Sequence, residues 1–274
     1  MVLTEKNFVI NSGSIHYAEG PPNDTPLVML HGMTGQWQYF VSMMPSLVLR
    51  YHLFAPDLRG HGGSSWTPGA YSTPDDVGDI AALLRNRVQK PAVVFGHSYG
   101  GIVATALAAS APELVRAVIT VDPPLPLLTK NGSWLDEIIY PFFQALHDII
   151  SQDTTDLDKM AQLGKLLPDL DALALRQRIP QYQHFDPERL TWSIDGRTKA
   201  GLTVETLVTG VVCPVLLVQC NPALGGMLDD ETAQYMVELL PDCIHLYRPD
   251  VGHDIPTTQP APLAKMVTDF LEIL

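Results

Sequence analysis

The sequence predicts an α/β fold: a mostly parallel, twisted sheet of about eight strands with helices on both faces. Short apolar runs recur along the chain and end in loops, which is typical of parallel strands buried on both faces. Stretches with helical spacing lie between these runs. One region, residues 125–207, interrupts the alternation because it contains no convincing buried strand.

The expected elements follow in chain order. Residues 7–10 and 14–18 predict a hairpin around Asn11-Ser12-Gly13. The apolar runs that predict buried strands are residues 28–30, 52–55, 93–95, 117–121, 215–218 and 244–247. Helical spacing predicts helices over residues 74–87, 99–110, 231–240 and 263–274.

The region without a strand predicts a helical cap that is inserted between two strands of the sheet. It holds amphipathic runs over residues 134–150 and 157–167, punctuated by prolines. We therefore expect an α/β core made of residues 1–124 and 208–274, and a cap made of residues 125–207.

Composition limits the function classes. Of the 274 residues, 46% are apolar and 17% charged, so the chain can bury a sizeable core. Acidic residues outnumber basic ones 30 to 17, for a formal net charge of −13, which disfavours nucleic-acid and anionic membrane partners. The start of the chain does not resemble a secretory signal, and the three cysteines are interpreted as reduced thiols. We expect a cytoplasmic protein with a small-molecule substrate; a homodimer is left open.

The pentapeptide Gly96-His97-Ser98-Tyr99-Gly100 follows an apolar run and precedes a predicted helix. It lacks the lysine of a phosphate-binding loop and the spacing of a dinucleotide fingerprint. The pattern G-x-S-x-G between a strand and a helix exposes the serine on a sharp turn, and its glycines let the helix pass close to the strand. Ser98 is therefore a candidate nucleophile, although the pentapeptide alone could be an ordinary turn.

A nucleophilic serine needs a base and a site for the oxyanion. His253 lies just past the last predicted strand, which fits the chain order serine, acid, histidine. His31-Gly32 ends an early strand, so the amides of Met33 and Tyr99 are candidates for the oxyanion hole. The alternatives are a surface or core histidine at 253 and a plain tight turn at His31-Gly32.

Four segments together resemble the α/β-hydrolase fold family: His31-Gly32, PDLRGHGGS at 56–64, GHSYGG at 96–101, and Gly252-His253. The resemblance covers nearly the whole chain. It implies a hydrolase with a Ser-His-acid triad, and this chemistry requires no metal and no cofactor.

The triad acid departs from the most common pattern of the family. That pattern puts an acid after the strand that precedes the histidine strand, where this chain has Asn221. Some α/β hydrolases take the acid from the strand directly after the elbow helix, and Asp122 ends that strand. Asp122 is therefore the predicted acid, and the alternative is that it only shapes a turn. Asp229 and Asp230 are interpreted as helix caps.

These residues predict a serine hydrolase that cleaves a carboxylic ester or lactone through an acyl-enzyme. The alternatives are C–C bond or amide hydrolysis on the same fold, or a ligand-binding protein that keeps the pocket without hydrolysis. Aromatic residues of the cap predict a medium-sized, largely apolar substrate. The candidate substrate-binding residues are Trp37, His31, Trp134 and Phe143.

Overall fold

The computed structural model describes residues 3–129, 133–168 and 170–274 of the chain. These residues form one eight-stranded sheet with the order β1-β2-β4-β3-β5-β6-β7-β8. The strands are β1 (Thr4–Ile10), β2 (Gly13–Glu19), β3 (Thr25–Leu30), β4 (Tyr51–Pro56), β5 (Ala92–His97), β6 (Val115–Val121), β7 (Val215–Cys220) and β8 (Cys243–Arg248). From β4 to β8 all neighbours are parallel, and β2 pairs antiparallel with both β1 and β4. The predicted fold class is confirmed.

The burial of the strands explains why their sequences differ. Every residue of β5 and of β7 is buried, and both segments are almost continuously apolar. The edge strands β1 and β8 are mostly exposed or half-buried and carry more polar side chains. Continuous apolar runs therefore mark inner strands of this sheet, as expected for strands that are covered on both faces.

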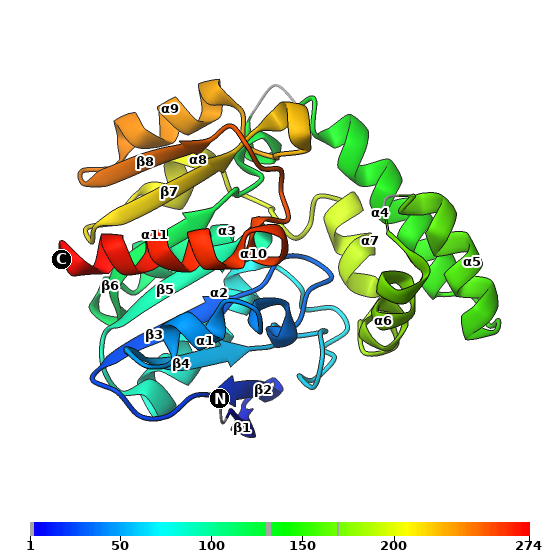
Figure 1. Cartoon of the computed structure of the whole chain (residues 1–274), viewed down its shortest axis with the longest axis horizontal. Helices are drawn as coiled ribbons and strands as arrows, with labels where there is room; N and C mark the ends of the chain where they lie inside the picture. The colour runs from blue at the N-terminus through cyan, green and yellow to red at the C-terminus, as the bar shows by residue number, and fades with distance from the viewer. Residues whose placement is uncertain (1–2, 130–132, 169) are drawn as a thin grey trace.

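Helices cover both faces of the sheet (Figure 1). One face packs against α2 (Thr73–Leu83), α3 (Tyr99–Ser110), α8 (Val204–Val208) and α9 (Asp230–Leu239). The other face packs against η1 (Trp37–Phe40), α1 (Met44–Leu47), α10 (Ile255–Thr258) and α11 (Pro260–Glu272). A short π-helical turn, η2 (Leu84–Val88), continues α2 to the end of the helix that was predicted there.

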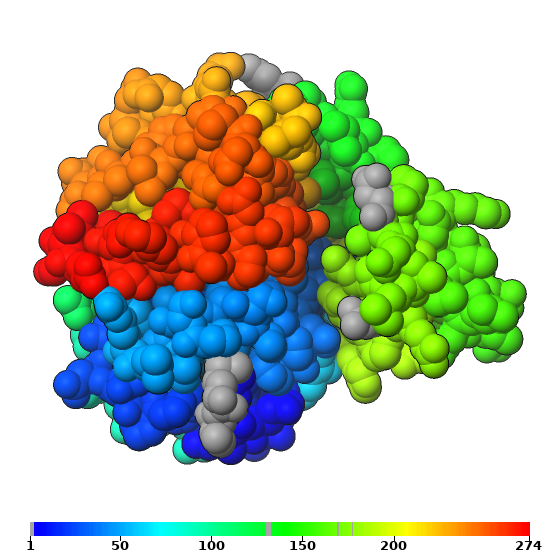
Figure 2. Space-filling view, in the orientation of Figure 1, coloured from blue at the N-terminus to red at the C-terminus, as the bar shows by residue number. Residues whose placement is uncertain are grey.

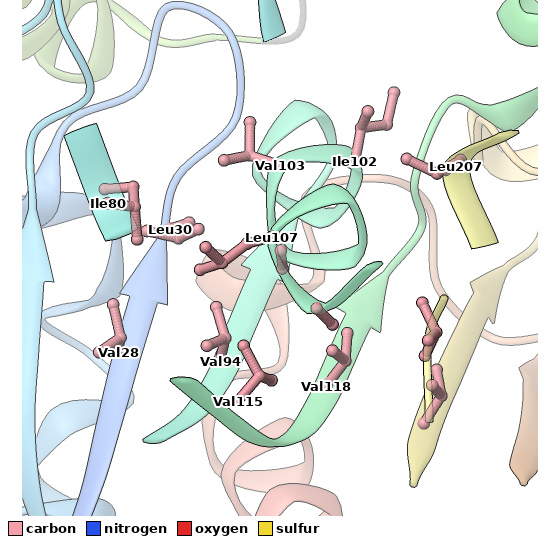
Figure 3. Close-up of a cluster of buried hydrophobic side chains, with 14 of the residues drawn as sticks. Val28, Leu30, Ile80, Val94, Ile102, Val103, Leu107, Val115, Val118 and Leu207 are labelled. Carbon is pink, nitrogen blue, oxygen red and sulfur yellow. The ribbon is translucent and has the colours of Figure 1, made fainter. Parts of the chain in front are cut away.

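Helix α3 lies directly on the central strands (Figure 3). Val103 and Leu107 of α3 are fully buried against Val94 of β5 and Val118 of β6. Truncating a buried leucine such as Leu107 to alanine typically costs about 2–5 kcal/mol. This packing fixes the start of α3, where Ser98 lies.

Between β6 and β7, the described residues form helices and turns but no strand. The helices are η4 (Leu125–Leu128), α4 (Asp136–Ile150), α5 (Asp156–Leu166), α6 (Ala172–Gln183), α7 (Glu188–Ile194) and α8. Helices α4 to α7 form a separate lobe that projects from one end of the core (Figures 1 and 2). Residues 130–132 and 169 of the predicted cap lie outside the described residues.

The predicted boundary of the cap at residue 207 falls inside α8. Val204, Leu207 and Val208 of this helix pack in the same buried cluster as α3. By its packing, α8 therefore belongs with the core. The division of the chain into a core and a cap otherwise stays a prediction.

Candidate active site

Ser98 lies on the sharp turn between β5 and α3. Its backbone has φ 55° and ψ −125°, a conformation that is rare for residues other than glycine. A Cβ atom on Gly96 would lie 2.1 Å from the carbonyl oxygen of Gly100, and one on Gly100 would lie 2.2 Å from that of Leu30. The glycines of the motif therefore allow the close approach that holds the strained serine in place.

Asp122 and His253 form a hydrogen-bonded pair at the ends of β6 and β8. His253 Nδ1 lies 2.7 Å from Asp122 Oδ2, and the Asp122 side chain is fully buried. The amide of Cys220 donates to Asp122 Oδ1 at 3.1 Å, and that of Met227 donates to Oδ2 at 2.8 Å. Burial raises the pKa of Asp122, but the hydrogen bond and charge of His253, with these two amides, outweigh it and hold the pKa below its ordinary value. Asp122 is therefore a carboxylate that fixes Nδ1 of His253 as the protonated nitrogen.

Two polar residues near the pair, Asn221 and Asp229, make hydrogen bonds to the backbone and not to His253. The side-chain oxygen of Asn221 accepts from the amide of Ala223, and its nitrogen donates to the carbonyl of Pro249. Asp229 accepts from the amide of Thr232 at 2.8 Å and caps α9, as predicted. These contacts leave Asp122 as the carboxylate that holds His253.

One cavity of about 380 Å³ brings the predicted catalytic groups together. Ser98, His253, Met33 and Tyr99 all line it. Its remaining wall comes largely from the helices between β6 and β7, and includes Ile138, Ile139, Phe142 and Phe143 of α4, Arg178 and Tyr182 of α6, and Leu127 and Leu128 of η4. The cavity thus lies between the carboxyl ends of the strands and the helical lobe, where α/β sheets bind their ligands.

A second layer of residues surrounds His253 and was not predicted from the sequence. The ring of His97 lies 4.6 Å from that of His253, and His97 Nε2 donates to the carbonyl of His253 at 2.8 Å. Burial, followed by the charge of His253, lowers the pKa of His97 to about 3, so this histidine is neutral. Tyr39 donates to the carboxylate of Asp254 at 2.8 Å beside them. The only signal for His97 in the sequence is its place inside the serine motif.

Two of the four predicted substrate-binding residues lie in the helical lobe. Phe143 lines the cavity, as predicted. Trp134 does not, because its half-exposed ring lies outside and its Nε1 donates to Asp229 at 2.9 Å. The prediction for Trp134 is corrected: its indole holds the lobe to the start of α9.

The other two predicted residues lie beneath the cavity and do not line it. Trp37 is buried in the core, and its amide donates to Asp57 at 2.7 Å. His31 is fully buried, with Nδ1 donating to the carbonyl of Gly32 at 2.8 Å and Nε2 accepting from the amide of Leu58 at 3.0 Å. These predictions are corrected as well, because the contacts of His31 and Trp37 hold the loop that follows β3.

Across the ranges that the structure describes, no group of three or more His, Cys, Asp or Glu side chains could hold a metal ion. In the same ranges, no helix combines the length and the apolarity that a membrane crossing requires.

Comparison with known proteins shows the family. A family model described as alpha/beta hydrolase fold matches residues 25–181, more than half of the chain. The chain therefore belongs to the α/β-hydrolase fold family, as its four sequence segments predicted.

Curated relatives resemble the chain over nearly its full length. The lipase LipV of Mycobacterium tuberculosis is 27% identical over 92% of this chain and 95% of its own. The pimeloyl-[acyl-carrier protein] methyl ester esterase of Yersinia pseudotuberculosis is 28% identical over 91% and 94%. The 2-(acetamidomethylene)succinate hydrolase of Mesorhizobium japonicum is 26% identical over 90% and 87%. A solved structure of E-2-(acetamidomethylene)succinate hydrolase superimposes with a TM-score of 0.78 at 23% identity, covering 99% of this chain and 100% of the other.

Proposed function

We propose that the protein is a serine hydrolase that cleaves a carboxylic ester or lactone of a medium-sized, largely apolar substrate. Ser98 is the nucleophile, His253 the general base and Asp122 the acid that orients it. The observation that carries the proposal is the 2.7 Å hydrogen bond between His253 Nδ1 and a buried Asp122, beside the cavity that Ser98 and His253 line.

The mechanism follows from this pair. Because Asp122 holds the proton on Nδ1, Nε2 of His253 is free to take the proton of Ser98. Ser98 Oγ then attacks the acyl carbon, and the amides of Met33 and Tyr99 stabilise the oxyanion. His253 next protonates the leaving alcohol. A water molecule attacks the acyl-enzyme in the same way and releases the acid.

The shape and lining of the cavity support the substrate class. A volume of about 380 Å³ suits a small organic ligand rather than a polymer. Four side chains of α4 form much of the apolar wall, which favours an aliphatic or aromatic acyl or alcohol group. Relatives named as a lipase and a methyl ester esterase support hydrolysis of an ester bond.

Amide hydrolysis is the second candidate. It is favoured by the relative whose named substrate carries an acetamido group. The same nucleophile, base and acid serve both reactions, and the leaving group decides between them. A small-molecule substrate and a cytoplasmic location stay predictions from composition.

The proposal is tested with a panel of 4-nitrophenyl esters of increasing acyl length, lactones, and amides matched to the best ester. The wild type is expected to hydrolyse esters with a preference for medium acyl chains, and Ser98→Ala is expected to abolish turnover. Ser110→Ala is the matched control, because Ser110 is an exposed serine at the other end of α3. Activity retained in Ser98→Ala would contradict the proposal, and faster cleavage of the matched amide would favour the second candidate.

A further inference from the structure

A fully buried ion pair connects the helical lobe to the core. Arg189 of α7 donates from Nη1 and Nη2 to Asp76 Oδ2 of α2, each at 3.0 Å. Both side chains are completely buried. Two buried charges are costly unless they are well paired, so this contact marks a defined docking of α7 on α2.

The same carboxylate also holds the residue that follows the nucleophile. The hydroxyl of Tyr99 donates to Asp76 Oδ2 at 2.5 Å, and the guanidinium of Arg189 lies 5.3 Å from the centre of the Tyr99 ring. Tyr99 also contacts Thr73 Oγ1, at 3.3 Å. The side chain of Asp76 on α2 therefore contacts both α7 and the start of α3.

Tyr99 connects this network to the chemistry of the site. It is the first residue of α3, and the first amides of a helix have no partner within the helix, so they are available to an anion. Its ring and its amide share one Cα atom, so fixing the ring restricts the peptide plane that carries the amide. The neighbouring Ser98 has a strained backbone that its surroundings must maintain.

We propose that Asp76 and Arg189 are positioning residues for the oxyanion hole and that they act through the side chain of Tyr99. The inference rests on the proposed function, because it requires an oxyanion at the Tyr99 amide. It means that docking of α7 completes the catalytic geometry, in addition to covering the cavity.

The structure offers a matched control for a purely structural role. The Tyr71 hydroxyl donates to Asp186 Oδ2 at 2.5 Å, just before α7, and the Tyr71 ring centre lies 5.2 Å from the same guanidinium of Arg189. Tyr71 is fully buried and does not line the cavity. Tyr71→Phe and Tyr99→Phe thus each remove one hydroxyl from the docking of α7, but only Tyr99 adjoins Ser98.

The test compares kcat, KM and thermal unfolding of Tyr99→Phe, Tyr71→Phe and the wild type on the best ester. We expect Tyr99→Phe to lower kcat about tenfold, less than the ~10²–10³-fold for complete loss of an oxyanion donor. We expect its KM to change less than about twofold, because the interaction matters in the transition state only. Tyr71→Phe is expected to keep kcat within about twofold of the wild type. It should lower the melting temperature by about as much as Tyr99→Phe does.

Equal kcat values for the two variants, with Ser98→Ala inactive, would overturn the inference and leave the proposed function intact. If the wild type hydrolyses no ester, lactone or amide, both fail. Asp76→Asn provides a second variant: it keeps an acceptor for the Tyr99 hydroxyl but not the charge. We expect the folded fraction of Asp76→Asn to lose kcat at an almost unchanged KM, and wild-type kcat in that fraction would also overturn the inference.

Discussion

The two walls of the cavity are built by different means. In the core wall, Ser98 has a φ angle of 55°, and Asp122, which holds the cavity-lining His253, has a φ angle of 46°. Each of the two is held by hydrogen bonds to neighbouring strands. In the cap wall, Phe142 and Phe143 are half-buried on α4 and rest on an apolar cluster within the lobe. Strained geometry persists only where the surroundings over-determine it, whereas apolar contacts tolerate exchange. We infer that the core wall sets the rate and the cap wall selects the substrate.

The largest effect is expected in the core wall. Asp122→Asn should lower kcat by about 10⁴-fold, the loss described for a triad aspartate in a serine protease, because the amide cannot stabilise charged His253. Steady-state kinetics on the best ester measure this. Asn221→Ala is the control and should change kcat only a few-fold, since its contacts are to Ala223 and Pro249. Similar losses in both variants would show that the acid is misassigned.

The proposed triad could be derived from the sequence because each member has a local signal. Ser98 lies in a glycine motif, and Asp122 and His253 end apolar strands whose order the chain alternation predicts. Because Asn221 occupies the commoner acid position, the sequence favours Asp122 as the acid. The amides of Cys220 and Met227, which hold the Asp122 carboxylate, carry no such signal, because a backbone donor at a given place depends on the loop conformation.

A smaller effect is expected in the cap wall. Phe143→Ala should lower kcat/KM for a medium-length apolar acyl ester about tenfold, because apolar contact with the substrate is lost. Hydrolysis of the acetyl ester should change less than about threefold. The ratio of the two values is the measurement. A uniform loss on both esters would mean that α4 supports the chemistry and that the division between the walls is wrong.

The pH dependence of stability is a further test of the core wall, in which His97 lies. His97 has a pKa of about 3 in the folded protein, against an ordinary value of about 6.5 in the unfolded chain. Between these values the unfolded chain binds a proton that the folded protein does not, so stability falls as the pH drops below about 6.5. Denaturant unfolding at pH 7 and pH 5 should show His97→Gln losing about 2 kcal/mol less than the wild type. An identical loss in both proteins would contradict a buried neutral His97.

The smallest effect is expected for Trp134, which lies outside the cavity. Trp134→Phe removes the hydrogen bond to Asp229, and should change kcat/KM less than about twofold on every ester. A change in the preference for acyl length would place Trp134 in the substrate path after all. The ester panel measures it directly.

The residues that were predicted wrongly and those that were not predicted share a physical cause. Trp37 follows the predicted oxyanion loop in the sequence, and Trp134 is an aromatic residue of the predicted cap, but the direction of a side chain depends on the fold around it. Asp76 and Arg189 are 113 residues apart and belong to no motif, so only the docked helices bring them together. Sequence patterns predicted the elements and the candidate catalytic residues that line or adjoin the cavity, whereas contacts between the lobe and the core depend on the folded structure.

The most direct test of the central claim is covalent labelling with a fluorophosphonate, located by mass spectrometry of the digested protein. The triad predicts a single adduct on Ser98, which is absent in Ser98→Ala and forms orders of magnitude more slowly in His253→Ala. Labelling of Ser110→Ala should match the wild type. An adduct on another residue, or undiminished labelling of Ser98→Ala, would contradict the assignment of Ser98 as the nucleophile.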